Sequence, residues 1–241
     1  TNSYKKKIIS KFKNKQTFVL IGMGGSILGA KAIYSFLKQK IKKKFVFIDN
    51  YQNENLELLK NKNRLNLIVS KSGNTLETIV NSNILIKKNI ENIFITENRD
   101  SYLKILANKL KAEVIHHNNF IGGRFSVLSE VGMLPAELMK LDPKKLRRLN
   151  NLASNQKFLN LVIENVSTML SHIEQKYMNS VILNYDKDSN DLFLWYQQLV
   201  AESLGKKGKG VLPIISSMPK DNHSVMQYYL DGPKNYFFTF F

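Results

Sequence analysis

The spacing of apolar residues predicts strands and helices that alternate along the first part of the chain. Short runs rich in β-branched and aromatic residues recur, and the segments between them carry apolar residues at helical spacing. The predicted strands are residues 18–22, 45–49, 65–70, 93–96 and 113–117. The predicted helices are residues 26–40, 75–88 and 101–110. Such alternation is typical of βαβ units, so we expect a parallel-sheet α/β/α sandwich.

The pattern changes after Asp142-Pro143 and then resumes. Residues 143–177 are basic, with apolar positions that predict one helix or a pair of helices. Further strands are predicted at 180–184, 211–215 and 236–241, with helices at 191–204 and 222–230. The predicted divisions are a first α/β domain at 1–142, a helical connection at 143–178 and the beginning of a second α/β domain at 179–241.

Composition narrows the class of protein. The chain has 241 residues, of which 43% are hydrophobic, so it can bury a sizeable core. No apolar run approaches the roughly 20 residues that span a bilayer, and residues 1–15 lack the apolar segment of a secretory signal. There is no cysteine, which excludes disulfides and thiolate metal sites. We expect a cytoplasmic protein without membrane contact.

The net charge of +17 is compatible with attraction to nucleic acid or to phosphorylated metabolites. The lysines are scattered through segments that are also rich in asparagine and isoleucine, as on solvated faces. No basic motif interleaved with aromatic residues is present, so we expect no nucleic-acid partner.

Two motifs combine small or hydroxyl residues with a predicted helix start, where free backbone N–H groups favour an anion. Residues 22–26 read Gly-Met-Gly-Gly-Ser, but their glycine spacing differs from the dinucleotide fingerprint. Residues 70–78 offer the hydroxyls of Ser70, Ser72, Thr75 and Thr78, which suit a phosphate dianion. The alternatives are a glycine turn needed only for packing and a helix start capped by Ser72 or Asn74.

Arg124 follows Gly122-Gly123 and precedes a helix predicted at 127–138. A cation before a helix N-terminus opposes the macrodipole, which favours an anion bound at the same place. The alternatives are a salt bridge to Glu130 and simple exposure to solvent.

Glu202 lies on a predicted helical stripe with Trp195, Gln198 and Leu199. Partial burial would raise its pKa towards values useful for a general base, while an ion pair with Lys206 is the alternative.

His223 follows Asp221 and Asn222, either of which could cap a helix with His223 in its first turn. The dipole there favours a neutral imidazole that exchanges a proton near neutral pH. We assign structural roles to the other histidines, which are His116, His117 and His172.

These five segments, taken in order, resemble the phosphoglucose isomerase family, and the likeness covers nearly everything from residue 17 onward. Single motifs of this sugar isomerase fold are shared with aminosugar synthases and with regulators that sense sugar phosphates. The more specific matches are residues 196–206, Tyr-Gln-Gln-Leu-Val-Ala-Glu-Ser-Leu-Gly-Lys, and His223 with residues 229–234, Tyr-Leu-Asp-Gly-Pro-Lys.

The resemblance implies interconversion of glucose 6-phosphate and fructose 6-phosphate through a cis-enediol, with no metal or nucleotide cofactor. It implies that Glu202 is the base, that Arg124 stabilises the enediolate and that His223, supplied by the neighbouring subunit of a homodimer, helps to open the sugar ring. The residues it implies for binding phosphate or sugar are Gly25, Ser26, Ser70, Lys71, Ser72, Thr75, Thr78 and Gln198.

The chain departs from the family pattern at both ends. The family's N-terminal helices and its C-terminal lysine, which assists ring opening, are missing, and the apolar faces of the predicted strand 236–241 lack cover. We therefore expect a fragment of a longer protein, and the alternative is a complete protein of reduced length. Two other functions stay open: a bifunctional phosphoglucose/phosphomannose isomerase and a non-catalytic module that binds sugar phosphates.

Overall fold

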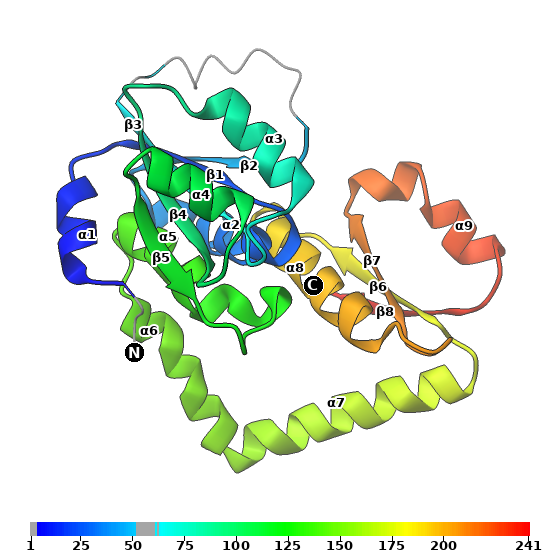
Figure 1. Cartoon of the computed structure of the whole chain (residues 1–241). Coiled ribbons are helices and arrows are strands. Elements are labelled where there is room, and N and C mark those ends of the chain that lie inside the picture. The colour runs from blue at the N-terminus through cyan, green and yellow to red at the C-terminus, as the bar shows by residue number, and fades with distance from the viewer. Residues whose placement is uncertain (1–3, 52–60, 62) are drawn as a thin grey trace. The chain divides into compact units, whose positions relative to one another are not determined.

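The computed structural model describes residues 4–51, 61 and 63–241 (Figure 1). These residues form two compact units, Thr1–Pro143 and Lys144–Phe241. The residues predicted to form a helical connection after Pro143 lie in the second of these units.

The first unit contains a five-stranded parallel sheet with the order β2-β1-β3-β4-β5. Its strands are β1 (Thr17–Ile21), β2 (Lys44–Ile48), β3 (Arg64–Val69), β4 (Glu91–Glu97) and β5 (Glu113–His117). Every residue of β1 and β3 is buried, as expected for central strands covered on both faces. The predicted parallel α/β fold is confirmed.

Alternate residues of each strand face two separate hydrophobic cores. Phe18 and Leu20 pack in one core with helices α1, α2 and α5, and Val19 and Ile21 pack in the other with α3 and α4. The helices are α1 (Lys6–Phe12), α2 (Leu28–Phe36), α3 (Leu76–Leu85), α4 (Tyr102–Lys109) and α5 (Glu130–Leu138). The unit is therefore a three-layer α/β/α sandwich.

Helix boundaries differ from the predicted ones where the chain makes 3-10 turns. The helix predicted at 26–40 is α2 flanked by the 3-10 turns η1 (Gly24–Ser26) and η2 (Lys38–Lys40). The helix predicted at 127–138 is preceded by η4 (Gly123–Leu128), which contains Arg124. The alternative in which Ser72 or Asn74 caps α3 is wrong, because Thr75 is the N-cap residue of this helix.

Arg64 at the start of β3 has a side chain that is 2% exposed. Its Nε donates to Oδ1 of Asn66 at 3.2 Å, and its Nη2 donates to the Leu85 carbonyl at 2.9 Å. Asn66 in turn donates to Asn92 on β4 at 2.9 Å. Burial lowers the pKa of the Arg64 guanidinium from its usual value. These hydrogen bonds tie β3, α3 and β4 together at the amino ends of the strands.

Replacing Arg64 with methionine is expected to lower the free energy of unfolding by about 2 kcal/mol, because two buried acceptors lose a charged donor. Urea unfolding measures the change. Arg99→Met is the matched control, since the Arg99 side chain is 56% exposed in its ion pair with Glu97, and its expected effect is below about 0.5 kcal/mol. Equal losses in the two variants would contradict the assignment.

The second unit contains a three-stranded parallel sheet with the order β7-β6-β8. The strands are β6 (Asn179–Asn184), β7 (Leu212–Ser217) and β8 (Tyr236–Phe240). The helices are α6 (Pro143–Arg147), α7 (Gln156–Glu174), α8 (Asn190–Leu204) and α9 (Met226–Asp231), with 3-10 helices at η5 (Arg148–Ser154), η6 (Lys187–Ser189) and η7 (Lys220–His223).

The core of the second unit lies between this sheet and α9, where Val181, Leu183 and Tyr229 are buried. In the described part of the chain β8 lies at an edge of its sheet, and Phe238 and Phe240 are 41% and 73% exposed. No helix among the described residues is both long enough and apolar enough to cross a membrane.

Candidate sugar-phosphate site

Three loops of the first unit follow the carboxyl ends of parallel strands, the edge at which α/β sheets bind ligands. The loops are residues 22–26 after β1, residues 70–75 after β3 and residues 118–124 after β5. Each contains one of the motifs singled out in the sequence. Because β1 and β3 are hydrogen-bonded neighbours and β5 lies two strands further along the sheet, one edge holds all three loops.

The loop at residues 70–75 is held by its own hydroxyl and amide groups. Ser70 is buried, and its Oγ lies 2.9 Å from Oγ1 of Thr75 and accepts from the Gly73 amide at 3.1 Å. Ser72 accepts from the Asn74 amide at 3.2 Å, and Asn74 Oδ1 accepts from the Tyr102 amide at 2.9 Å. The loop is therefore fixed before any ligand binds.

The candidate phosphate-binding hydroxyls differ in how far they are exposed. Ser72 and Thr75 are half-buried, whereas Thr78 in α3 is 1% exposed and its Oγ1 has no hydrogen-bond partner among the described residues. Ser72 and Thr75 therefore lie nearer to solvent than Ser70 and Thr78. Ser26, at the end of η1, is half-buried.

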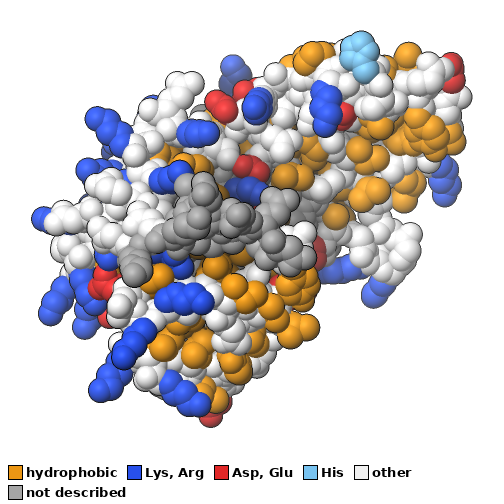
Figure 2. Space-filling view, turned by 90° about the horizontal axis from the view of Figure 1, so that it is seen from above, with side chains coloured by type: hydrophobic (Ala, Val, Ile, Leu, Met, Phe, Trp, Pro, Cys, Tyr) orange, Lys and Arg blue, Asp and Glu red, His pale blue; other side chains and the backbone are white. Residues whose placement is uncertain are grey.

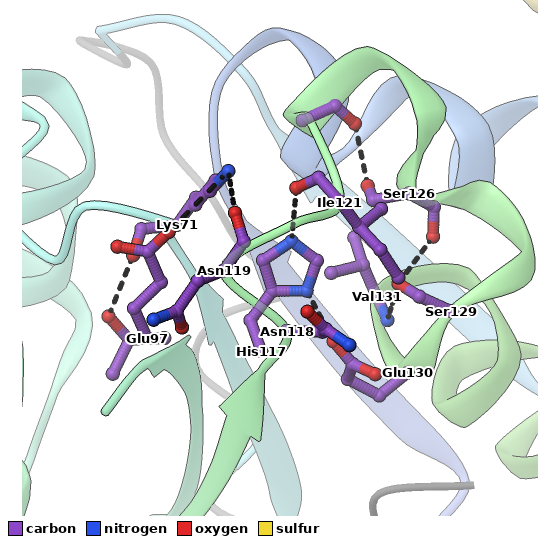
Figure 3. A network of polar contacts seen from close by, with 12 residues as sticks. Lys71, Glu97, His117, Asn118, Asn119, Ile121, Ser126, Ser129, Glu130 and Val131 are labelled. Carbon is purple, nitrogen blue, oxygen red and sulfur yellow. Dashed lines mark hydrogen bonds and ion pairs between the residues drawn. The ribbon is translucent and has the colours of Figure 1, made fainter. Parts of the chain in front are cut away.

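Lys71 joins two of the loops (Figure 3). Its Nζ donates to the Asn119 carbonyl at 3.0 Å and lies 3.5 Å from Oε1 of Glu97, the last residue of β4. Glu97 is also paired with Arg99 at 3.0 Å. The ammonium group thus has an anion and a carbonyl as partners within the first unit.

Gly25 lies against the loop that contains Arg124. A Cβ atom on Gly25 would fall 2.2 Å from the Gly123 carbonyl carbon and 2.5 Å from the Arg124 amide nitrogen. Ser126 is buried, and its Oγ lies 2.6 Å from the Gly123 carbonyl oxygen and 3.2 Å from the Gly25 carbonyl oxygen, so its one hydrogen is shared between the two acceptors. The close approach of two backbones requires glycine at this position. Arg124 is half-buried as a residue, and its guanidinium carbon lies 4.6 Å from the centroid of the Phe125 ring.

The buried pair of His117 and Glu130 was not predicted from the sequence. The two residues are 3% and 5% exposed, and Nδ1 of His117 is hydrogen-bonded to Oε1 of Glu130. Glu130, the alternative partner considered for Arg124, is thus paired with His117. The sequence held one usable signal, a histidine at the end of a strand and a glutamate at the start of the next α-helix.

Glu202 lies near the C-terminal end of α8 in the second unit, and Gln198 donates to its Oε2 at 3.2 Å. Oε1 of Gln198 is buried and has no partner among the described residues. The expected partial burial of Glu202 is wrong, because the side chain is exposed. The helical stripe does place Gln198 and Glu202 side by side.

The expectation that His223 lies in the first turn of an α-helix is wrong. His223 ends the 3-10 turn η7, and α9 begins at Met226. Asp221 accepts a hydrogen bond from the Ser217 amide at 2.8 Å, which holds the turn to the end of β7. The helix-dipole argument for a neutral imidazole therefore does not apply, and His223 is exposed.

A hollow of about 690 Å³ lies within the second unit and contains none of the predicted site residues. It is bordered by α7, α8 and the strands β6 and β8. His172 stacks on Phe237 at 4.8 Å, and burial raises the pKa of the Tyr196 phenol above its usual value. Nδ1 of His172 is buried and lacks a partner among the described residues.

Two further observations concern charge and metals. On the face shown in Figure 2, Lys and Arg side chains are spread among uncharged ones without forming one continuous stripe. Within the described ranges, no group of three or more His, Asp or Glu side chains is arranged to hold a metal ion.

The family model described as phosphoglucose isomerase matches residues 5–212. The chain is 36% identical to the glucose-6-phosphate isomerase of Methanocaldococcus jannaschii over 93% of this chain and 59% of that protein. It is 33% identical to the glucose-6-phosphate isomerase of Mycoplasmopsis synoviae over 97% of this chain and 60% of that protein. The chain thus spans about 60% of the length of these curated relatives.

Solved structures show the same fold. A hypothetical protein from Thermus thermophilus superposes with a TM-score of 0.79 at 26% identity, over 97% of this chain and 62% of the other. A glucose-6-phosphate isomerase from Chlamydia trachomatis superposes with a TM-score of 0.74 at 24% identity, over 94% of this chain and 50% of the other.

Proposed function

The chain belongs to the phosphoglucose isomerase family, and we propose from this that it is part of an enzyme that interconverts glucose 6-phosphate and fructose 6-phosphate. The observation that carries the proposal is that three loops lie at one edge of the first sheet. One of them, at residues 70–75, presents hydroxyl groups and is held by its own hydrogen bonds, and another contains Arg124. The names of the relatives support this substrate pair over mannose 6-phosphate and over a non-catalytic module.

In the proposed reaction the loop at residues 70–75 binds the phosphate through the hydroxyls of Ser72 and Thr75 and through backbone N–H groups. Gly25 and Ser26 lie in the loop after β1, at the same edge of the sheet. The Ser70 hydroxyl holds the loop at residues 70–75 through its contacts with Thr75 and the Gly73 amide. Lys71 contributes positive charge there, although its nearest partners are Asn119 and Glu97.

Glu202 removes the hydrogen on C2 of the open-chain aldose as a proton, and the C1 carbonyl becomes the oxygen of an enediolate. Arg124 stabilises the negative charge that develops on this oxygen. Return of the proton to C1, with transfer of the C2 hydroxyl proton to O1, gives the ketose. Gln198 holds Glu202 through its amide, and His223 assists opening of the sugar ring. No external oxidant or reductant is needed, because the oxidation of C2 is balanced by the reduction of C1 within the same molecule.

Three further points stay predictions: that the protein forms a homodimer, that the neighbouring subunit contributes His223, and that the protein is cytoplasmic. They follow from the family resemblance.

The proposal is tested by incubating the purified chain with fructose 6-phosphate and measuring glucose 6-phosphate with a coupled dehydrogenase. We expect turnover, and we expect Ser72→Ala combined with Thr75→Ala to raise KM about 10-fold with a small change in kcat, because two phosphate ligands are lost. Thr168→Ala on α7, whose hydroxyl donates to the Glu164 carbonyl of its own helix, is the control.

Other outcomes separate the alternatives. Binding of fructose 6-phosphate without turnover would favour the non-catalytic module. Comparable turnover of mannose 6-phosphate would favour the bifunctional enzyme. If the double variant had the wild-type KM, the phosphate would bind elsewhere.

A further inference from the structure

The segment that contains Arg124 begins and ends at the pair of buried residues His117 and Glu130. His117 is the last residue of β5, and Glu130 is the first residue of α5, 13 residues later. The segment between them forms the loop at 118–124 and the 3-10 helix η4. The contact between the two side chains therefore holds the two ends of this segment together (Figure 3).

The hydrogen-bond partners of His117 determine how many hydrogens the pair of side chains must carry. His117 Nε2 lies 3.2 Å from the Ile121 carbonyl, which can only accept, so Nε2 carries a hydrogen. The contact between Nδ1 and Glu130 requires a second hydrogen. The pair is therefore either an imidazolium with a carboxylate or an imidazole with a carboxylic acid.

The contacts of His117 reach the backbone next to Arg124. Nε2 fixes the Ile121 carbonyl, which directly precedes Gly122 and Gly123. Lys71 fixes the Asn119 carbonyl of the same loop at 3.0 Å. Further along, Ser126 is bonded to the Gly123 and Gly25 carbonyls, and Ser129 donates to the Ser126 carbonyl at 2.7 Å. The backbone of the segment is thus held on both sides of Arg124.

We propose that His117 and Glu130 are positioning residues for Arg124, which hold the Arg124 segment so that its guanidinium meets the charge of the enediolate. This inference rests on the proposed isomerase function. Neither side chain touches the substrate, since both are buried. Their effect is transmitted through the Ile121 carbonyl and the start of α5 to the residues that flank Arg124.

The test is a double-mutant cycle between Glu130 and Arg124, measured as kcat and KM for fructose 6-phosphate. Glu130→Leu, which removes the carboxylate at similar volume, is expected to lower kcat on the order of 10-fold through misplacement of Arg124, with KM unchanged within about twofold. In the background of Arg124→Ala, the same substitution is expected to have less than about a twofold further effect. Independent, multiplicative losses would overturn the proposal.

A conservative variant separates positioning from folding. Glu130→Gln keeps a donor for Nδ1 of a neutral imidazole and is expected to retain kcat within about threefold. Tyr4→Phe is the matched control, because the Tyr4 hydroxyl donates to Glu137 of the same helix at 3.0 Å, away from the loop. It should lower the melting temperature without lowering kcat. A fall of kcat in Tyr4→Phe equal to that in Glu130→Leu would overturn the proposal.

A third measurement does not depend on turnover. The chain has four histidines, so the ring signals of His117 can be assigned by ¹⁵N NMR as those that vanish in His117→Gln. We expect a hydrogen at Nε2 in both the wild type and Glu130→Gln, with its exchange slowed by the contact with the Ile121 carbonyl. A His117 ring in fast exchange with solvent would overturn the inference alone. A wild-type chain that neither turns over nor binds fructose 6-phosphate would overturn the proposed function, and with it the role of Arg124.

Discussion

Replacing Glu202 with glutamine is expected to lower the rate of isomerisation at least about 100-fold, because a general base at the reacting carbon is lost. Glutamine keeps the size of the side chain and can still hydrogen-bond Gln198, which lies 3.2 Å away. We therefore expect kcat to fall while KM for fructose 6-phosphate changes little. The coupled assay measures both constants, and fluorescence or circular dichroism verifies that the variant is folded.

Glu174→Gln is the matched control for this variant. Glu174 is also an exposed glutamate at the C-terminal end of a helix in the second unit, as the last residue of α7. Its replacement is expected to leave the rate unchanged. If Glu202→Gln retained activity within a few-fold of the wild type, a different group would have to transfer the proton between C1 and C2.

Replacing Gly25 with alanine is expected to reduce the free energy of unfolding by about 3 kcal/mol and to abolish sugar-phosphate binding. The added methyl group would lie 2.2 Å from the Gly123 carbonyl carbon, so two stretches of backbone must separate. Backbone cannot move aside as the end of a flexible side chain can. The Arg124 segment would shift away from the loop at residues 22–26, since Ser126 bridges the two.

Gly123→Ala is the matched control, because Gly123 belongs to the other backbone segment of the same contact. A Cβ atom on Gly123 would have no atom within 4 Å, so this variant should lose less than about 1 kcal/mol. Urea unfolding compares the two stabilities, and calorimetry compares the binding of fructose 6-phosphate. Equal stability of the two variants would show that the loops separate at little cost, which contradicts the rigid contact inferred from the structure.

The fold was predictable because its strongest signals are properties of long, buried segments. The central strands β1 and β3 are buried throughout, so the apolar residues that make up most of each strand stand out against the polar turns that follow. The helices of the first unit place apolar residues at regular spacing for the same reason. The order of the strands in the sheet is harder to predict from the sequence, because it depends on which face of the sheet each connecting helix covers.

The details of the candidate site were less predictable, since they depend on a few hydrogen bonds. Residues 220–223 form a 3-10 turn, and the hydrogen bond from the Ser217 amide to Asp221 that holds this turn to β7 has no marker in the local sequence pattern. One of the two partners of Lys71 is a backbone carbonyl on another loop, which no local pattern marks. The pairing of His117 with Glu130 depends on the approach of β5 to α5, a tertiary property.

The edge strand β8 has a consequence for the behaviour of the chain in solution. Four of its five residues are aromatic, none is charged, and Phe240 is 73% exposed. Uncharged edge strands of this composition associate with one another, because their unpaired backbone groups form further ladders. The yield of refolded protein should therefore fall steeply as its concentration rises, and a lysine at Phe240 should raise it.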